Sequence, residues 1–132
     1  MDLVIDTSAV LAVLLDEPER GALIEATAGA TLCIPPSVPW EVGNAVSALV
    51  RRRRLTRTQA RRVVQSFEAI PVETVAIELE RAVDLADVHG LYAYDAYLLE
   101  AARARRAPLV TLDRALRRAA GRMGIHTVEI GA

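Results

Sequence analysis

The sequence contains no lysine, so arginine supplies all sixteen of its Lys and Arg residues. Its one cysteine, Cys33, excludes a disulfide framework and is typical of proteins of the reducing cytosol. No basic segment precedes the first apolar run, so a signal peptide is not expected. The longest apolar run, Ala9–Leu15, is far too short to span a bilayer. We therefore expect a cytoplasmic protein with no membrane attachment.

The length and composition are those of a globular chain. The 132 residues suit one domain, spanning residues 1–132, and a chain of this length can bury a sizeable core. Hydrophobic residues make up 52% and charged residues 25%, which excludes a disordered chain. The formal net charge is −1, but the charges are unevenly placed, because seven arginines and no acid occur between Arg51 and Arg62.

Short apolar runs alternate with amphipathic stretches of helical length along the whole chain. This alternation predicts an α/β fold in which helices cover both faces of a five-stranded parallel sheet. The expected strands are Leu3–Asp6, Thr31–Ile34, Ile70–Val75, Pro108–Leu112 and Ile125–Ile130. The expected helices are Ser8–Leu15, Glu19–Ala28, Val38–Arg53, Arg57–Ala69, Ile77–Val88, Tyr94–Arg106 and Arg114–Arg122.

Four acidic residues are expected to meet at one edge of this sheet. Right-handed crossovers put the carboxyl ends of parallel strands on the same edge, where ligands bind in open α/β sheets. Asp6 and Asp113 each end an expected strand. Glu41 lies in the first turns of the helix after the second strand, and Asp95 lies near the start of the helix before the fourth. The topology therefore directs four carboxylates from four segments toward one place.

Two explanations of these acids remain open at this point. Taken singly, each acid suits a helix N-cap or a first helical turn. Taken together, they repel one another by ~1 kcal/mol per close pair in water and ~4 kcal/mol at an effective dielectric near 20, unless a cation binds. Carboxylates suit Mg²⁺ or Mn²⁺, and the two histidines, His89 and His126, are isolated in the sequence.

The motifs around these acids resemble those of the PIN domain family, and more narrowly those of VapC-type toxin ribonucleases from toxin–antitoxin pairs. The segments concerned are Asp6-Thr7-Ser8-Ala9, Glu41-Val42-Gly43-Asn44-Ala45, Tyr94-Asp95-Ala96 and Thr111-Leu112-Asp113. The resemblance implies a PIN-like three-layer fold and endonucleolytic cleavage of RNA that depends on Mg²⁺ or Mn²⁺. It also implies a small VapB-like antitoxin as partner, and a homodimer. The family often has serine or threonine before the third acid, where this chain has Leu91-Tyr92-Ala93-Tyr94.

On this interpretation Asp6, Glu41, Asp95 and Asp113 form a metal cluster that is also the catalytic site. Asp6 and Asp95 are expected to bind the ion directly, and Glu41 and Asp113 through water. The residues expected to orient the carboxylates or waters are Thr7, Ser8, Asn44 and Thr111. For Ser8 and Thr111, ordinary capping and turn hydrogen bonds are an equally good explanation.

The basic segment has a functional and a structural explanation of equal weight. Arginine binds phosphate well, so the segment is a candidate RNA-binding region. Arginines near a helix C-terminus also suit the helix dipole and need no ligand. The residues concerned are Arg51, Arg52, Arg53, Arg54, Arg57, Arg61 and Arg62. Four aromatic residues, Trp40, Tyr92, Tyr94 and Tyr97, are candidates for stacking on bases, although Trp40 is better explained by core or interface packing.

Other protein classes also gather acids at a parallel-sheet edge. Response-regulator receivers and haloacid-dehalogenase-type phosphatases rely on a lysine near the phosphoryl group, which this chain lacks. The phosphatase motif also needs an acid where this chain has Ser8. A non-catalytic RNA- or antitoxin-binding module of the same fold is the remaining alternative. For the antitoxin we expect an apolar helix that lies in a groove and a basic arm that reaches the four acids.

Overall fold

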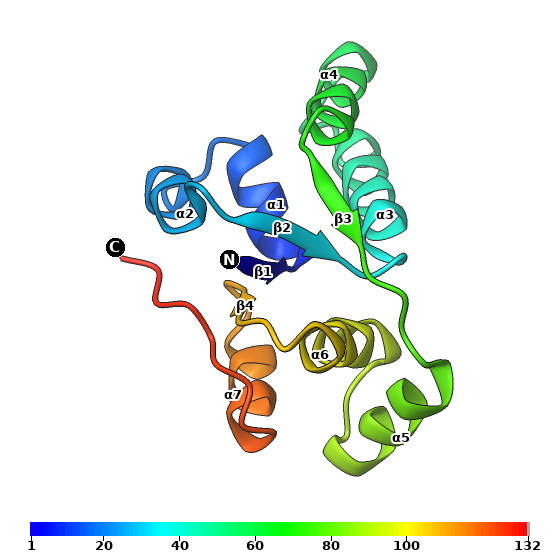
Figure 1. The fold of residues 1–132 in the computed structure, drawn as a ribbon. Helices are drawn as coiled ribbons and strands as arrows, with labels where there is room; N and C mark the ends of the chain where they lie inside the picture. The colour runs from blue at the N-terminus through cyan, green and yellow to red at the C-terminus, as the bar shows by residue number, and fades with distance from the viewer. Residues whose placement is uncertain (132) are drawn as a thin grey trace.

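The computed structural model describes residues 1–131, which form a parallel sheet between two groups of helices (Figure 1). The strands are β1 (Asp2–Ile5), β2 (Thr31–Ile34), β3 (Val72–Thr74) and β4 (Leu109–Val110). They are hydrogen-bonded in the order β3-β2-β1-β4, and every pair is parallel. The α/β fold class and the parallel sheet predicted from the sequence are therefore confirmed.

Residues 1–131 contain seven helices, as the sequence predicts; six of them lie between strands and the seventh follows β4. They are α1 (Thr7–Leu14), α2 (Arg20–Thr27), α3 (Val38–Arg51), α4 (Arg57–Glu68), α5 (Leu79–His89), α6 (Ala93–Arg105) and α7 (Arg114–Arg122). Helices α1 to α4 gather on one side of the sheet and α5 to α7 on the other (Figure 1). The expected helix bounds are correct to within two residues at each end, because caps such as the Thr56–Gln59 capping box of α4 mark where helices begin.

The expected fifth strand, Ile125–Ile130, is wrong. This segment makes one parallel bridge to the sheet, between Thr127 and Leu109, with Val128 N donating to Leu109 O at 2.9 Å. The reason is that its neighbour β4 has only two residues in the ladder, so few backbone groups remain to pair with a further strand. Within residues 1–131 the sheet has four strands.

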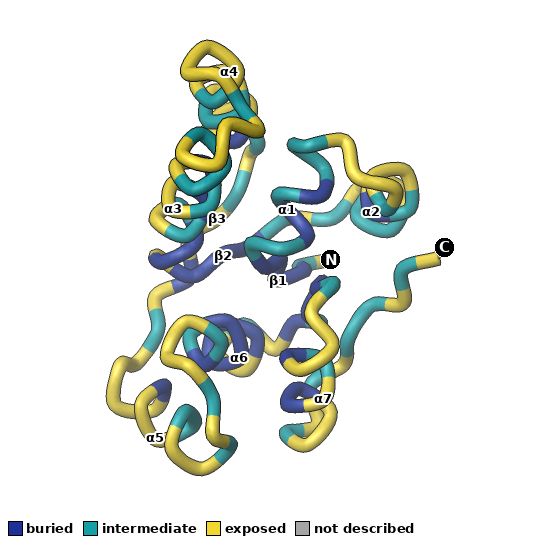
Figure 2. Tube along the Cα trace, turned by 180° about the vertical axis from the view of Figure 1, so that it is seen from behind, coloured by how far each residue is buried: buried dark blue, intermediate teal, exposed yellow. Residues whose placement is uncertain are grey.

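The core lies between the strands and the helices on each face. Val4, Cys33, Leu99 and Leu109 have no exposed surface, and they come from β1, β2, α6 and β4. Burial is deepest in the central strands, whereas the tips of the outer helices are exposed (Figure 2). None of the described helices combines the length and apolar character needed to cross a membrane. A rigid sheet thus fixes the edge at which β1 and β4 end.

Candidate active site

Asp6 stands at the carboxyl end of β1 and is the N-cap of α1. Only 5% of its surface is exposed. Its carboxylate accepts hydrogen bonds from Ala9 N at 2.9 Å, from the Ser8 hydroxyl at 2.7 Å and from the Thr111 hydroxyl. The Ser8 hydroxyl also lies 2.9 Å from the second carboxylate oxygen, so each oxygen of Asp6 has two donors within reach. Asp6 is therefore held in one orientation.

Two hydroxyl groups join this carboxylate to the segment between β4 and α7. Ser8 Oγ, which donates to Asp6, accepts a hydrogen bond from Leu112 N at 3.1 Å. Thr111 Oγ1, which also donates to Asp6, accepts one from Asp113 N at 3.0 Å. The ends of β1 and β4 are thus tied together around a single acid.

Asp113 follows β4 and begins α7, as the sequence predicts. Its carboxylate accepts hydrogen bonds from Ala115 N at 2.9 Å and Leu116 N at 3.1 Å, and the residue is exposed. These bonds satisfy backbone donors that the first turn of a helix leaves unpaired. The capping role is therefore present in the structure, and it leaves the second carboxylate oxygen of Asp113 available toward the site.

Glu41 reaches the same edge from the first turn of α3. It is half-buried and accepts a hydrogen bond from the hydroxyl of Ser37, which is itself buried, at 3.3 Å. The Thr7 hydroxyl lies close enough to lower the pKa of Glu41, yet Thr7 Oγ1 is buried with no well-formed hydrogen bond to any described residue. A buried hydroxyl with an unused donor and acceptor is a place where a water molecule or ion fits.

The charges of the four acids act on one another. Burial is the main cause that raises the pKa of Asp6, of Glu41 and of Asp95, the half-buried acid in the first turn of α6. The charge of Asp113 raises the pKa of Asp6 and Asp95 further, and the charges of Asp6 and Asp95 do the same for Glu41. The structure therefore brings together the four acids that the sequence predicted at one edge.

The four carboxylates do not all converge on one point. Among residues 1–131, no group of three or more His, Cys, Asp and Glu side chains is close enough to hold a metal ion. Mg²⁺ commonly takes only one or two carboxylates and keeps several waters. The all-oxygen donor set and the Thr7 hydroxyl, which has no well-formed partner among the described residues, fit an ion of this kind. They do not fit an ion that all four acids would ligate directly.

Asn44 differs from the other residues predicted to orient the site. It lies three residues after Glu41 on α3 but is exposed, and no described residue forms a hydrogen bond with its side chain. Two residues that sequence reasoning missed do contribute to the site. They are Ser37, described above, and Arg117, which is half-buried and whose Nη2 donates to Thr111 O at 3.2 Å. The sequence carried one signal for these two residues: Ser37 lies four residues before Glu41.

The seven arginines of the basic segment, here called the hairpin arginines, lie where α3 turns into α4. They are Arg51, Arg52, Arg53, Arg54, Arg57, Arg61 and Arg62, and all are exposed. This end of the α3–α4 pair stands away from α5, α6 and α7 (Figures 1 and 2). None of the ion pairs found within residues 1–131 involves a hairpin arginine. Their charges are therefore available to an external anion.

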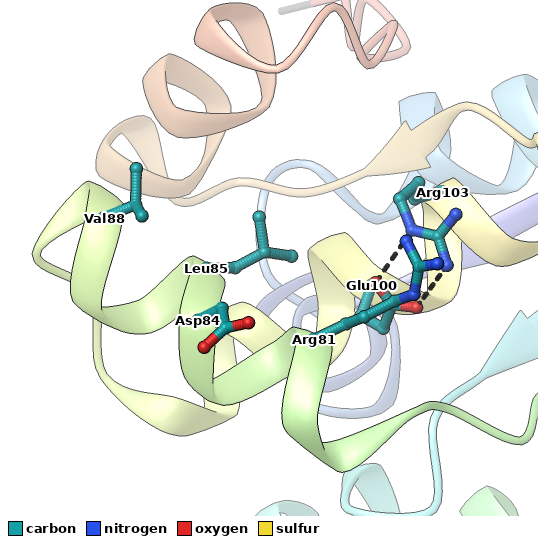
Figure 3. Close-up of a pocket in the computed structure, with 6 residues that line it drawn as sticks. All are labelled: Arg81, Asp84, Leu85, Val88, Glu100 and Arg103. Carbon is teal, nitrogen blue, oxygen red and sulfur yellow. Dashed lines mark hydrogen bonds and ion pairs between the residues drawn. The ribbon is translucent and has the colours of Figure 1, made fainter.

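A separate cavity of about 240 Å³ lies between α5 and α6 (Figure 3). It is lined by Arg81, Asp84, Leu85, Val88, Glu100 and Arg103. Glu100 is fully buried there and accepts from Arg103 Nη2 at 2.6 Å and Nε at 2.9 Å. This pair satisfies a buried charge, and none of the four site acids lines the cavity. We therefore place the candidate active site at the sheet edge and not here.

Comparison with known proteins agrees with this geometry. The PIN domain profile matches residues 3–122. Ribonuclease VapC9 of Mycobacterium tuberculosis is 32% identical over 113 residues, which cover 84% of this chain and 85% of that protein. The crystal structure of PAE2754 from Pyrobaculum aerophilum matches with a TM-score of 0.73 at 24% identity, over 90% of this chain and 79% of that one. VapBC2 from Rickettsia felis, bound to a DNA fragment from its promoter, matches with a TM-score of 0.65 at 19% identity, over 90% and 93%.

The chain belongs to the PIN domain family, among its VapC-type members. The solved structures are too distant in sequence to show more than the fold, and they confirm the PIN-like arrangement of a parallel sheet between helices.

Proposed function

We propose that this protein is a metal-dependent endoribonuclease that acts in the cytoplasm as the toxin of a VapBC-type pair. One observation carries the proposal: four acids from four segments share one sheet edge, and the most buried of them, Asp6, is fixed by hydrogen bonds from Ser8, Ala9 N and Thr111. The name of its relative, Ribonuclease VapC9, supports RNA as the substrate.

Mg²⁺ or Mn²⁺ is the proposed cofactor, with Asp6 and Asp95 as direct ligands and Glu41 and Asp113 acting through water. When bound, such an ion polarises a phosphate oxygen and lowers the pKa of the water that attacks phosphorus. Ser8 and Thr111 hold the Asp6 carboxylate in place for this role, and Ser37 does the same for Glu41. The attack of water forms one P–O bond and breaks the P–O bond to the next nucleotide, whose oxygen takes up a proton.

The hairpin arginines are the proposed site of contact with the RNA backbone. They are exposed and unpaired among the described residues, and they lie on a projecting part of the fold. Each guanidinium can bind a phosphate oxygen through two parallel N–H groups. Because such contacts release counterions, we expect them to make RNA binding depend on salt concentration.

A small antitoxin is the proposed inhibitor, and a homodimer is the proposed assembly. Neighbours of similar fold were solved as toxin–antitoxin complexes, for example one from Klebsiella pneumoniae at 20% identity. In this chain an apolar cavity of about 190 Å³ lies between α1, α2 and α4, with Val10, Leu23 and Phe67 among its lining residues. Its volume is that of one side chain, so it suits an apolar side chain presented by an antitoxin helix, and the negative sheet edge suits a basic arm.

The deciding experiment is a cleavage assay on mixed cellular RNA, with sequencing of the new ends. We expect cleavage with Mg²⁺ or Mn²⁺ and none in excess EDTA, with activity restored when the metal is returned. Undiminished cleavage in EDTA would overturn the metal mechanism. Binding of RNA without cleavage under any divalent metal would favour the alternative, a non-catalytic RNA- or antitoxin-binding module.

A further inference from the structure

Three large aromatic side chains are left in solvent beside the acids. Trp40 is 73% exposed, Tyr92 is 85% exposed and Tyr94 is 49% exposed. Of the two kinds of packing expected for Trp40, packing in the core is wrong, because its side chain is exposed in the first turn of α3, whereas packing at an interface stays a prediction. Rings of this size contribute strongly to stability when they are buried, so three exposed together call for an explanation.

The positions of these rings follow those of the acids. Trp40 directly precedes Glu41 in the first turn of α3. Tyr92 is the N-cap of α6, and Tyr94 directly precedes Asp95 in its first turn. The charge of Asp95 acts on Glu41, so the first turns of these two helices lie near one another. The rings therefore lie at the two helix starts that carry Glu41 and Asp95.

The ring of Tyr94 is held in place by a neighbouring tyrosine on the same helix. The rings of Tyr94 and Tyr97 pack edge to face, with centroids 5.8 Å apart and planes at 85°. This contact limits the rotation of Tyr94 while about half of its surface stays exposed. Tyr94 is thus presented to solvent as a fixed surface, which lowers the entropy lost when a ligand binds to it.

We propose that Trp40, Tyr92 and Tyr94 form a stacking surface for the unpaired bases on either side of the phosphate to be cleaved. The inference rests on the proposed function and names the side chains of this chain that would hold the bases of the RNA. Stacking suits this position because the neighbouring acids repel phosphates, whereas the contact of a base with a ring needs no charge. Every base has a π-face, so the surface accepts RNA without requiring a particular sequence.

A second copy of this chain is a less suitable occupant of the same rings. A two-fold interface puts the same patch of both subunits together. Because each ring borders the acids, such an interface would bring two clusters of carboxylates close to one another and cover both sites. Like charges in contact are unfavourable unless cations lie between them. Single-stranded RNA meets the rings with neutral bases and places only one phosphate at the acids.

The chain offers a direct probe of this proposal, because Trp40 is its only tryptophan. We would add a labelled single-stranded RNA oligonucleotide in EDTA, where the proposed cleavage does not proceed, and follow its binding by anisotropy and tryptophan emission together. A gel checks that the RNA stays intact. We expect emission to be quenched as the single strand binds. The same oligonucleotide annealed to its complement should give little quenching at equal saturation.

Variants test whether the aromatic ring itself is needed for single-strand binding. Trp40→Ala and Tyr92→Ala should each weaken single-strand binding by about 5- to 150-fold, the measured range for loss of one stacked base. Trp40→Phe and Tyr92→Phe keep a ring and should retain most of the affinity. Leu79→Ala, which removes a 60% exposed apolar side chain on α5, is the matched control and should change nothing. The ratio for Trp40→Ala should be the same at low and high salt, because no ion pair is removed.

Each contrary result has its own meaning. An oligonucleotide that binds to saturation without affecting Trp40 emission overturns the stacking surface and leaves the proposed nuclease intact. One that does not bind at all overturns both the stacking surface and RNA as the substrate. Emission that shifts with protein concentration in the absence of RNA, together with a change in mass on gel filtration, would place the rings between protein copies and overturn the proposal.

Discussion

The acid cluster and the hairpin arginines are opposite ways of building a charged site. The acids come from four segments separated by up to about a hundred residues and lie at the sheet edge, where hydrogen bonds tie Asp6 and Ser8 to the segment that precedes Asp113. The hairpin arginines come from one stretch of twelve residues, are exposed and have no partner among residues 1–131. The first site exists only in the folded protein, whereas the second is already present in the local sequence.

This difference suggests separate roles for the two regions: catalysis for the acids and RNA binding for the hairpin arginines. A carboxylate that is buried and held by hydrogen bonds, such as Asp6, can position an ion and a water with the accuracy that chemistry needs. Exposed arginines can bind the phosphates of an irregular backbone but fix no reacting atom. We therefore expect substitutions in the cluster to change catalysis and those in the hairpin to change binding. The largest effect is expected at the most buried acid.

Asp6→Asn should lower the rate of RNA cleavage by more than about 100-fold, which is the upper range for loss of an outer-shell partner of a metal. The amide can still accept from Ala9 N and act as an N-cap, so the protein should stay folded. Cleavage assays and circular dichroism on the same preparation check both points. If the variant unfolds, Asp6 is a structural cap and the catalytic assignment fails.

Thr111→Val should weaken the affinity for Mg²⁺ or Mn²⁺ by about 10- to 100-fold, the range for outer-shell partners. The change removes the hydroxyl that donates to Asp6 and accepts from Asp113 N, at nearly constant volume. Isothermal titration with Mn²⁺ measures the loss. Thr111→Ser keeps the hydroxyl and is the control; equal affinity in Thr111→Val and the parent protein would contradict the role of this bond.

Replacing Arg51, Arg52 and Arg54 together by Gln should weaken RNA binding and flatten its dependence on salt. The slope of log affinity against log salt should fall by about 2, since each phosphate neutralised on a single strand contributes about 0.7 to the slope. Arg53, whose φ is 59°, is left unchanged so that the turn between α3 and α4 keeps its own residue at this position. Arg118→Gln with Arg122→Gln, on exposed positions of α7, is the control. An unchanged slope would assign the hairpin arginines to solvation alone.

The raised pKa values predict a pH dependence of stability in the metal-free protein. Asp6, Glu41 and Asp95 bind protons more tightly when folded than when unfolded, where their usual values are 3.8 and 4.5. The folded state therefore holds more protons above these values, and the free energy of unfolding falls as pH rises through the raised pKa values. The fall should be on the order of 1 kcal/mol, since Glu41 and Asp95 are partly exposed and screened.

Urea denaturation in EDTA between pH 4 and pH 7 measures this effect. Asp95→Asn should make the dependence shallower, because one of the three acids no longer titrates. Added Mg²⁺ should oppose the loss at higher pH by binding the ionised carboxylates. Stability that rises with pH in EDTA would mean that the acids are stabilised as anions by the protein itself.

The smallest effect is expected at Asn44. Its side chain is exposed and makes no hydrogen bond to the described residues, so Asn44→Ala should leave the metal affinity and cleavage rate within about two-fold. A larger loss, measured in the same titration as Thr111→Val, would bring Asn44 into the site through water. That result would restore the role that its spacing from Glu41 predicted.

The sequence predicted where helices begin and end better than it predicted which strand residues pair in the sheet. Helix α7 begins and ends where expected, because Asp113 caps it and an apolar stripe follows. The fourth and fifth strands were both expected to be longer, since apolar runs predict burial and do not show how many backbone groups find a partner. Burial of Val110 and half-burial of Ile125 are consistent with the pattern that suggested these strands.

For the candidate site, too, the sequence predicted the positions of residues but not their contacts. The acids were predictable because strand ends and family-like motifs locate them without any side-chain detail. The contacts of Ser37 and Arg117 were not, since each depends on how closely two turns approach. Asn44 shares a helix with Glu41, but three residues carry it about 4.5 Å further along the helix axis. The exposure of Trp40 depends on what covers α3, and the sequence alone carries no information on that.

The hydrogen bonds from Thr111 to Asp6 and from Leu112 N to Ser8 span 105 and 104 residues of a 132-residue chain. During translation the first strand emerges long before its partner in this site has been synthesised. Asp6 then lacks both the hydroxyl that orients it and the neighbouring charge of Asp113. A ribosome making this protein is thus not exposed to a partly made, active nuclease, because the proposed activity can arise only after Thr111 and Asp113 have been synthesised and have folded against β1. The delay would give the proposed antitoxin time to meet its target at the moment the site first forms.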